Sequence, residues 1–261
     1  MLFPDTPRIV FKKNTLKEVI CQFRFPPILE IASTGPAAFQ KLVRKNYPLY
    51  EREDTDAIPK DIFPLEITQV FSQFKFMKPP ESVVHKFLTE DKNRFISLSS
   101  NFLALTDTHY ECWEDFSKEM ITTKKAFDEI YTPAFYSRLG LRYLDIINPE
   151  ELGAGGETWK NLVNPALINL LGTKFCDHVK QTQTTTLIEV DEIKNAFITL
   201  RHGLISDGKA YQIDADIYIQ GKINDENEKL QQFHRVLGNL FRWAASGRLK
   251  ELLGTLRIIK N

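Results

Sequence analysis

The chain has few cysteines, no long apolar run and no excess of charge of either sign. Its three cysteines, Cys21, Cys112 and Cys176, are odd in number and stand far apart, which disfavours a disulfide framework and the paired spacing of a zinc site. No apolar stretch approaches the ~18 residues of a membrane-spanning helix. Residues 1–10 lack the basic region and apolar run of a secretory signal. We therefore expect a cytoplasmic protein.

Recognisable cofactor and metal motifs are also missing. The glycine-rich segment 153–156 has no phosphate-loop lysine and does not match the dinucleotide fingerprint. Cys176 and His178 are too close in sequence to have the spacing of metal ligands. The 34 basic and 34 acidic side chains cancel, so there is no electrostatic footprint for nonspecific nucleic-acid binding. We expect no cofactor, no bound metal and no nucleic-acid partner.

Phenylalanine is abundant, with 19 residues in a chain of 261, and this length allows a substantial core. Period-two alternation of apolar residues predicts strands, and apolar residues at helical spacing predict two long amphipathic helices, at 112–130 and from 224–225 onward. The polar segment 50–60 is typical of a solvated loop, and 61–80 fits either a strand or a short helix. The main predicted strands are 16–25, 83–89, 94–99, 102–106, 134–147, 183–190, 196–204 and 210–219.

These elements predict an α+β protein in which antiparallel sheets pack with the two long helices. The order of strand, helix, three strands and long helix occurs twice, so we expect an internal pseudo-duplication of a β-α-β-β-β-α unit. Its halves are residues 1–132, which include an N-terminal extended arm, and residues 133–261, packed as one compact unit. At an offset of 118 residues Arg24 falls on Arg142, and at 117 Phe116 falls on Phe233.

Several stretches resemble a sporadically distributed bacterial family of uncharacterised proteins of about this length. The resemblance implies a bacterial or archaeal soluble protein, and brings no activity, substrate or catalytic residue with it. The patchy distribution suggests a gene that spreads by horizontal transfer, with defence or toxin–antitoxin loci as its expected context. The stretches that carry the resemblance are 13–29, 86–91, 102–106, 113–116, 139–147, 164–167, 200–203, 213–216 and 240–244.

A polar set alternates with apolar residues on the expected strands. In the strand at 210–219 Asp214 and Asp216 face away from the apolar side chains, because successive side chains point to opposite faces of a sheet. Thr199 and several arginines occupy similar positions on other strands. The residues predicted to bind a ligand are Arg24, Arg142, Arg201, His202, Asp214 and Asp216.

Three interpretations of this set compete. The arginines could clamp an anion, or Asp214 and Asp216 could hold a divalent cation or act as a base. Alternatively, the set forms cross-strand ion pairs with a structural role, which is the commoner situation. For His202 a structural role competes with that of a general base.

The function that the sequence favours is a non-enzymatic binding module, with a sheet-face groove for a small anionic ligand or a partner protein. In this hypothesis Arg142→Ala abolishes binding with little loss of stability, whereas a large fall in melting temperature supports the ion-pair interpretation. The alternative is a metal-dependent hydrolase or nuclease-like enzyme that uses Asp214 and Asp216. A homo-oligomer is left open.

Overall fold

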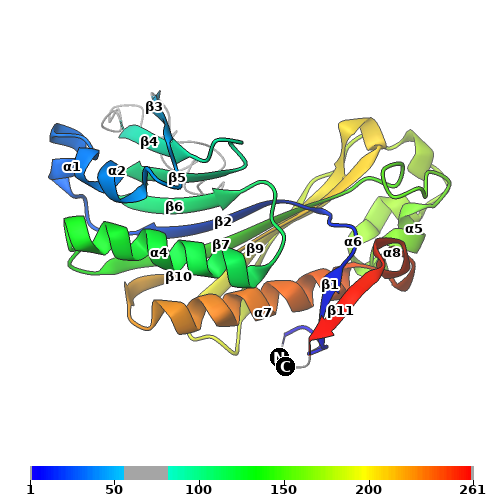
Figure 1. The fold of residues 1–261 in the computed structure, drawn as a ribbon. Coiled ribbons are helices and arrows are strands. Elements are labelled where there is room, and N and C mark those ends of the chain that lie inside the picture. The colour runs from blue at the N-terminus through cyan, green and yellow to red at the C-terminus, as the bar shows by residue number, and fades with distance from the viewer. Residues whose placement is uncertain (1, 56–81, 260–261) are drawn as a thin grey trace, which may run out of the picture.

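A computed structural model describes residues 2–55 and 82–259 of the chain (Figure 1). Its main feature is one continuous nine-stranded sheet in which every neighbouring pair of strands is antiparallel. In spatial order the strands are β3 (Leu49–Thr55), β4 (Ser82–Leu88), β5 (Arg94–Ser99), β6 (Phe102–Asp107), β2 (Leu16–Arg24), β7 (Tyr136–Ile147), β10 (Ala210–Ile223), β9 (Ala196–Ile205) and β8 (Thr184–Val190).

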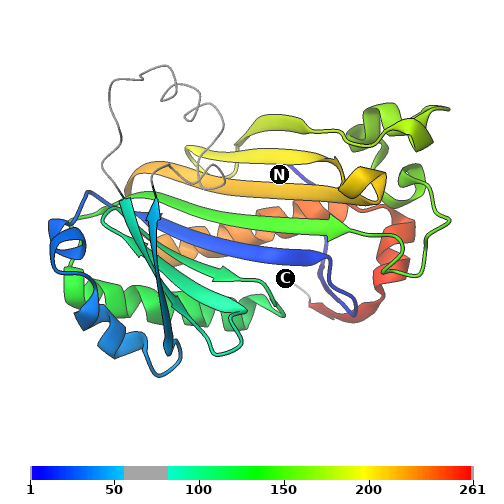
Figure 2. The same cartoon turned by 90° about the horizontal axis from the view of Figure 1, so that it is seen from above.

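Two long helices, α4 (Trp113–Tyr131) and α7 (Glu226–Ala244), pack against one face of this sheet (Figure 1). Their apolar residues recur at helical spacing, so each helix buries one side, which includes Phe116 in α4 and Phe233 in α7. The main core lies between this side of the helices and the sheet. Figure 2 looks onto the opposite face, where the strands lie in front of the helices. We call this the open face, a name that denotes only the side of the sheet without the two long helices, because several of its side chains, such as Gln22, Ala104 and Asp214, are buried.

Shorter elements lie around the sheet. They are α1 (Leu29–Ser33), α2 (Ala37–Val43), α5 (Trp159–Leu162), α6 (Pro165–Ile168) and α8 (Gly247–Leu253), with 3₁₀ turns at Asn169–Gly172, Cys176–His178 and Ser206–Gly208. The N-terminal arm contains β1 (Arg8–Phe11), which pairs with β11 (Thr255–Ile259) in a separate two-stranded ribbon. Strands from near the two ends of the chain therefore lie side by side (Figure 1). The extended arm was predicted from the sequence, whereas its partner strand was not.

The α+β class with antiparallel strands is confirmed, as are the predicted strands and both long helices within a few residues. The loop expected at 50–60 is wrong for residues 50–55, which belong to β3. This edge strand carries charged side chains, for example Glu53, which accepts a hydrogen bond of 2.5 Å from Lys86 of the neighbouring β4, and charged residues suit a solvent-facing edge. Residues 56–60 of that predicted loop and the ambiguous segment 61–80 lie outside the described residues.

None of the helices in the described ranges is both long and apolar enough to cross a membrane.

Candidate functional site

The strand register brings most of the predicted polar set together on the open face. Asp216 lies opposite Arg142 on β7 and opposite Thr199 on β9, and Asp214 lies opposite Arg201. Because directly paired residues of antiparallel strands point to the same face, these side chains share one surface. β2 extends this surface with Gln22 and Arg24.

Asp214 is the centre of an ion-pair cluster. Arg142 donates from Nε to Oδ1 at 2.7 Å and from Nη2 to Oδ2 at 2.8 Å, a two-point contact, and Arg201 Nη1 lies 3.5 Å from Oδ2. The Asp214 side chain is only 2% exposed. Burial acts to lower the pKa of Arg142, but the hydrogen bond and charge of Asp214 outweigh it and raise that pKa overall. The cluster is thus a desolvated charge network rather than a surface ion pair.

Arg138 is a second arginine of this face and was not among the predicted site residues. Its Nη2 donates to Asp216 Oδ2 at 2.9 Å, its Nη1 donates to Gln22 Oε1 at 3.1 Å, and its guanidinium lies 4.7 Å from the centre of the Tyr218 ring. A Cβ atom at Gly140 would stand 2.5 Å from Arg138 Nη1. Glycine at this position therefore leaves the space in which the guanidinium lies across β7.

Arg24 lies directly opposite Arg138 in the pairing of β2 with β7. Its Nε donates to Gln22 Oε1 at 3.2 Å, so one amide oxygen serves both guanidinium groups. Burial, with a smaller effect of the neighbouring Arg138 charge, lowers the pKa of Arg24 to about 10. Two like charges are thus held close together at this end of the face.

A groove of about 280 Å³ lies beside these charges. Buried Thr199, next to Asp216, has a side-chain oxygen without a hydrogen-bond partner among residues 2–55 and 82–259. Burial raises the pKa of Asp216, and the charges of Arg138 and Arg142 oppose this. Charged and apolar side chains both line the groove, and among them are Ile20, Gln22, Lys86, Phe102, Arg138 and Arg142.

His202 lies on the other face of the sheet. It pairs with Ile213 of the core face, and its Nδ1 forms a hydrogen bond of 2.7 Å with the Tyr211 hydroxyl, which donates to the Leu167 carbonyl oxygen. Burial lowers the His202 pKa. The structure therefore separates His202 from the arginines and aspartates of the open face.

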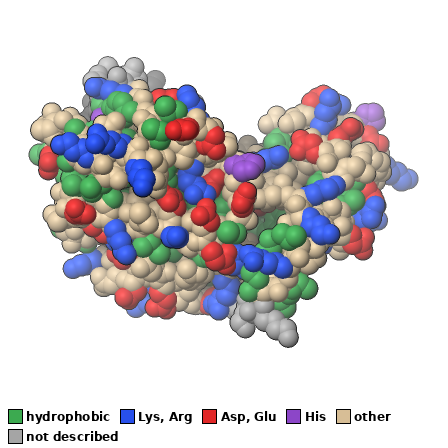
Figure 3. Space-filling view, in the orientation of Figure 1, with side chains coloured by type: hydrophobic (Ala, Val, Ile, Leu, Met, Phe, Trp, Pro, Cys, Tyr) green, Lys and Arg blue, Asp and Glu red, His purple; other side chains and the backbone are tan. Residues whose placement is uncertain are grey.

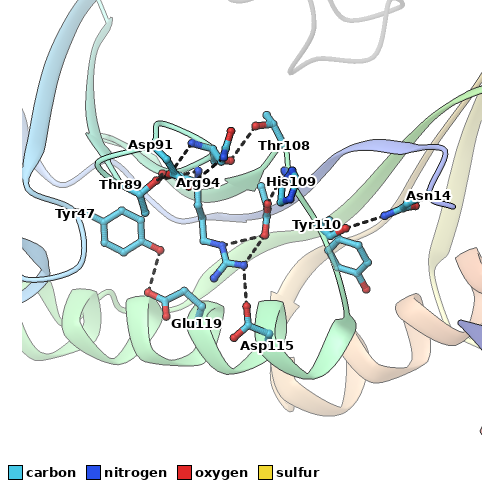
Figure 4. A network of polar contacts seen from close by, with 12 residues as sticks. Asn14, Tyr47, Thr89, Asp91, Arg94, Thr108, His109, Tyr110, Asp115 and Glu119 are labelled. Atoms are coloured by element: carbon cyan, nitrogen blue, oxygen red, sulfur yellow. Dashed lines mark hydrogen bonds and ion pairs between the residues drawn. The ribbon is translucent and has the colours of Figure 1, made fainter. Parts of the chain in front are cut away.

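A different polar network ties the sheet to α4 (Figure 4). Arg94 donates to Asp107 Oδ2 at 2.9 and 2.6 Å and to Asp115 of α4 at 2.8 Å, and the Tyr47 hydroxyl donates to Glu119 at 2.9 Å. All of these contacts join neighbouring elements. We assign this network a structural role, because each charged group has its partner within it.

Asp145 is a buried carboxyl on the core face of β7, opposite Ile213. Its Oδ1 accepts a hydrogen bond of 2.7 Å from the Thr15 hydroxyl. Burial raises the pKa of Asp145 to about 7, although the Thr15 hydrogen bond acts to lower it. The side chain thus keeps its proton far above the pH at which a solvated aspartic acid ionises.

This shift predicts a pH effect on stability. Between the pKa of about 3.9 expected in the unfolded chain and the folded value of about 7, the native state binds more protons, so the stability that Asp145 contributes falls as pH rises. Asp145→Asn keeps a neutral acceptor for Thr15 and should remove this slope. Urea unfolding from pH 4 to 7.5 should show that the unfolding free energy of the variant rises relative to that of the wild type, by ~4 kcal/mol at most. If the unfolding free energies of the two proteins change with pH in parallel, Asp145 is already ionised in the folded protein over this pH range.

The described residues contain no group of three or more histidine, cysteine, aspartate or glutamate side chains arranged to hold a metal ion. Searches of protein-family models and of the curated proteins found no match to this chain.

Proposed function

We propose that this protein is a non-enzymatic binding module that holds a small anionic ligand in the open-face groove. The observation that carries the proposal is the groove itself, where Lys86, Arg138 and Arg142 meet an apolar floor. Arg138 uses two of its five N–H groups on Gln22 and Asp216. The remaining donors suit a carboxylate or phosphate, which guanidinium groups bind through paired hydrogen bonds.

The balance of charge in the groove favours a small ligand over a polyanion. Glu18, Glu53 and Asp216 also line it, so three acidic side chains offset the three basic ones. A volume of about 280 Å³ is near the lower end of ligand pockets, which begin at roughly 300 Å³. The ligand class that fits is a compact carboxylate or phosphate with hydrogen-bonding groups of its own.

The strand order supports an internal duplication as the origin of this groove. Apart from the edge strand β3, the sheet runs toward its centre as β4-β5-β6-β2 in one half and as β8-β9-β10-β7 in the other, and each series precedes a long helix, α4 or α7, in sequence. The two halves meet where β2 pairs with β7. In this proposal Arg24 and Arg142 are related positions, and the ligand lies across the junction of the repeats.

The hydrolase alternative stays a prediction, and the geometry favours it less. Both oxygens of Asp214 already accept hydrogen bonds from Arg142, and Arg201 lies beside one of them, so a cation would have to displace an arginine. Calorimetric titration with Mg²⁺ and Mn²⁺ tests it directly. Stoichiometric uptake that Asp216→Asn abolishes would favour the enzyme.

The binding proposal is tested by NMR of arginine side chains. Titration with citrate, phosphate or acetate should shift the Nε–H signals of Arg138 and Arg142 in a saturable way. Ala104→Leu, which adds volume at a buried lining residue, should weaken this response roughly tenfold. Arg248, which lies in α8 and pairs with Glu157, provides the signal that should not move. The proposal fails if none of the three anions shifts Arg138 or Arg142 in the folded protein.

A further inference from the structure

A larger cavity lies on the core side of the sheet, between α7 and the ribbon of β1 and β11. Its volume of about 600 Å³ is within the usual range of ligand pockets, roughly 300–1,000 Å³. Figure 3 shows a hollow on this side of the molecule, with hydrophobic side chains inside it and charged side chains around it. Since the open-face groove is on the other side of the sheet, the two sites are separate.

Aromatic side chains form two walls of this cavity. Phe11 of β1 packs edge-on against Phe241 of α7, with ring centres 6.1 Å apart, and Tyr110 lies 6.1 Å from Tyr143 of β7. Asn14 holds the Tyr110 backbone by donating to its carbonyl oxygen at 2.7 Å (Figure 4). Walls of this kind suit a planar apolar group, because aromatic rings favour tilted and edge-on contacts with one another.

Arg242 of α7 supplies a positive charge to the cavity without a counter-ion. Its Nε donates to Thr6 Oγ1 at 2.7 Å, its Nη2 donates to Asn239 Oδ1 at 2.5 Å and to the Thr6 carbonyl oxygen at 3.4 Å, and all three acceptors are neutral. In the described ranges it forms no salt bridge, and its Nη1 donates to no residue. Burial lowers the Arg242 pKa, and Asp5 opposes this only through its more distant charge. A half-buried guanidinium without a carboxylate partner is costly, and an anion entering from solvent would relieve that cost.

Arg8 lines the same cavity and, unlike Arg242, has a carboxylate partner. Its Nη1 and Nη2 donate to the two oxygens of Glu114 at 2.5 and 3.0 Å. That contact raises the pKa of Arg8 and lowers the pKa of Glu114 to about 2. The difference between the two arginines singles out Arg242 as the anion contact.

The Tyr143 hydroxyl and the His234 ring, which also line the cavity, are neutral at physiological pH. The Tyr143 hydroxyl forms a hydrogen bond of 2.7 Å with His234 Nδ1, and the His234 ring stacks on Trp113 at 4.4 Å. Burial lowers the pKa of His234 to about 3. These two groups offer uncharged hydrogen bonds, whereas the Asp145 carboxyl, with its pKa of about 7, is mostly uncharged only below that pH.

We propose that this cavity binds a small aromatic carboxylate, whose carboxylate pairs with Arg242 and whose ring packs among Phe11, Tyr110, Tyr143 and Phe241. The aromatic walls select the ring, and the unpaired guanidinium selects the negative charge. A hydroxyl group on the ring would find hydrogen-bond partners at the neutral inner groups. The site is independent of the open-face groove.

The test is isothermal calorimetry with 4-hydroxybenzoate and its neutral analogue 4-hydroxybenzamide. The acid should bind in this cavity, and the amide roughly tenfold or more weakly, because it lacks the charge that Arg242 pairs with. Arg242→Gln should weaken binding of the acid by a similar factor. Arg248→Gln, which removes the same charge from a position outside the cavity, should leave binding unchanged.

Blocking variants at Gly238 give a second line of test. This α7 residue lines the cavity, and a Cβ atom there would stand 3.1 Å from Arg242 Nη1, the mobile end of a side chain. Gly238→Leu should abolish binding, and Gly238→Ala, which favours the helix, should weaken it while keeping the fold. Absence of binding by the acid, equal binding of acid and amide, or unchanged binding in Arg242→Gln or in folded Gly238→Leu would overturn the proposal. Ala104→Leu on the open face should have no effect here.

Discussion

Replacing Arg142 with alanine is expected to cost about 3 kcal/mol of unfolding free energy, because it leaves the buried carboxylate of Asp214 without its main partner. Arg201 stays 3.5 Å from one oxygen of that carboxylate and keeps the cost at the lower end of the usual range. Urea unfolding at pH 7 measures the effect. This expectation differs from the small stability loss inferred from sequence for a binding arginine, since the aspartate is desolvated.

Arg248→Ala is the matched control. Arg248 forms a hydrogen-bonded ion pair of the same length, 2.7 Å, with Glu157, but its side chain is 47% exposed. Solvent screens such a pair, so its loss should cost much less unfolding free energy than the loss of Arg142. The double replacement Arg142→Met with Asp214→Leu should be more stable than Arg142→Ala, because it removes the buried carboxylate together with its main partner. If Arg142→Ala loses no more unfolding free energy than Arg248→Ala, the buried carboxylate of Asp214 does not need Arg142 as its partner.

Gly203→Ala is expected to destabilise the protein by at least ~3 kcal/mol or to prevent folding, through a backbone clash combined with strain. A Cβ atom at Gly203 would lie 2.0 Å from the Thr182 carbonyl oxygen, and the residue has a φ of +154°, which L-residues rarely adopt. The neighbouring Leu204 accepts from the Thr182 amide at 3.2 Å and donates to its hydroxyl at 2.9 Å. The close approach of these two segments therefore needs glycine.

Gly156→Ala is the control for this change. Gly156 has no atom within 4 Å of the added Cβ position and no positive φ. Thermal unfolding of both variants should leave Gly156→Ala within a few tenths of a kcal/mol of the wild type. A Gly203→Ala protein with normal stability would require residue 182 to lie farther from β9 than it does here.

Local sequence pattern was enough to place many side chains on the correct face. The alternation around Asp214 and Asp216 predicted that their side chains point to one face of the strand and those of Ile213 and Ile217 to the other face. This follows because the period of two is a property of each strand by itself. The same rule would have added Arg138 to the predicted site residues and removed His202 from them. Arg138 and Arg142 are four positions apart on β7 and share a face, whereas His202 directly follows Arg201 and must face away from it.

Contacts between distant segments were beyond such reasoning. β11 is short, and its pairing with β1 depends on the two chain ends meeting. Arg242 fits the polar side of α7 in sequence, and only the position of Thr6, 236 residues away, shows which neutral groups hold it. The missed cavity lies between elements from opposite ends of the chain, so no local signal marks it.

The sequence by itself determined the α+β class, the two long amphipathic helices and the alternating faces of the strands, because these follow from periodicity and local propensity. The tertiary structure decided which strands are neighbours and how deeply the charges are buried. Those properties depend on packing between segments far apart in the chain. They make Asp214 a desolvated partner of Arg142 and leave Arg242 without a counter-ion beside a cavity.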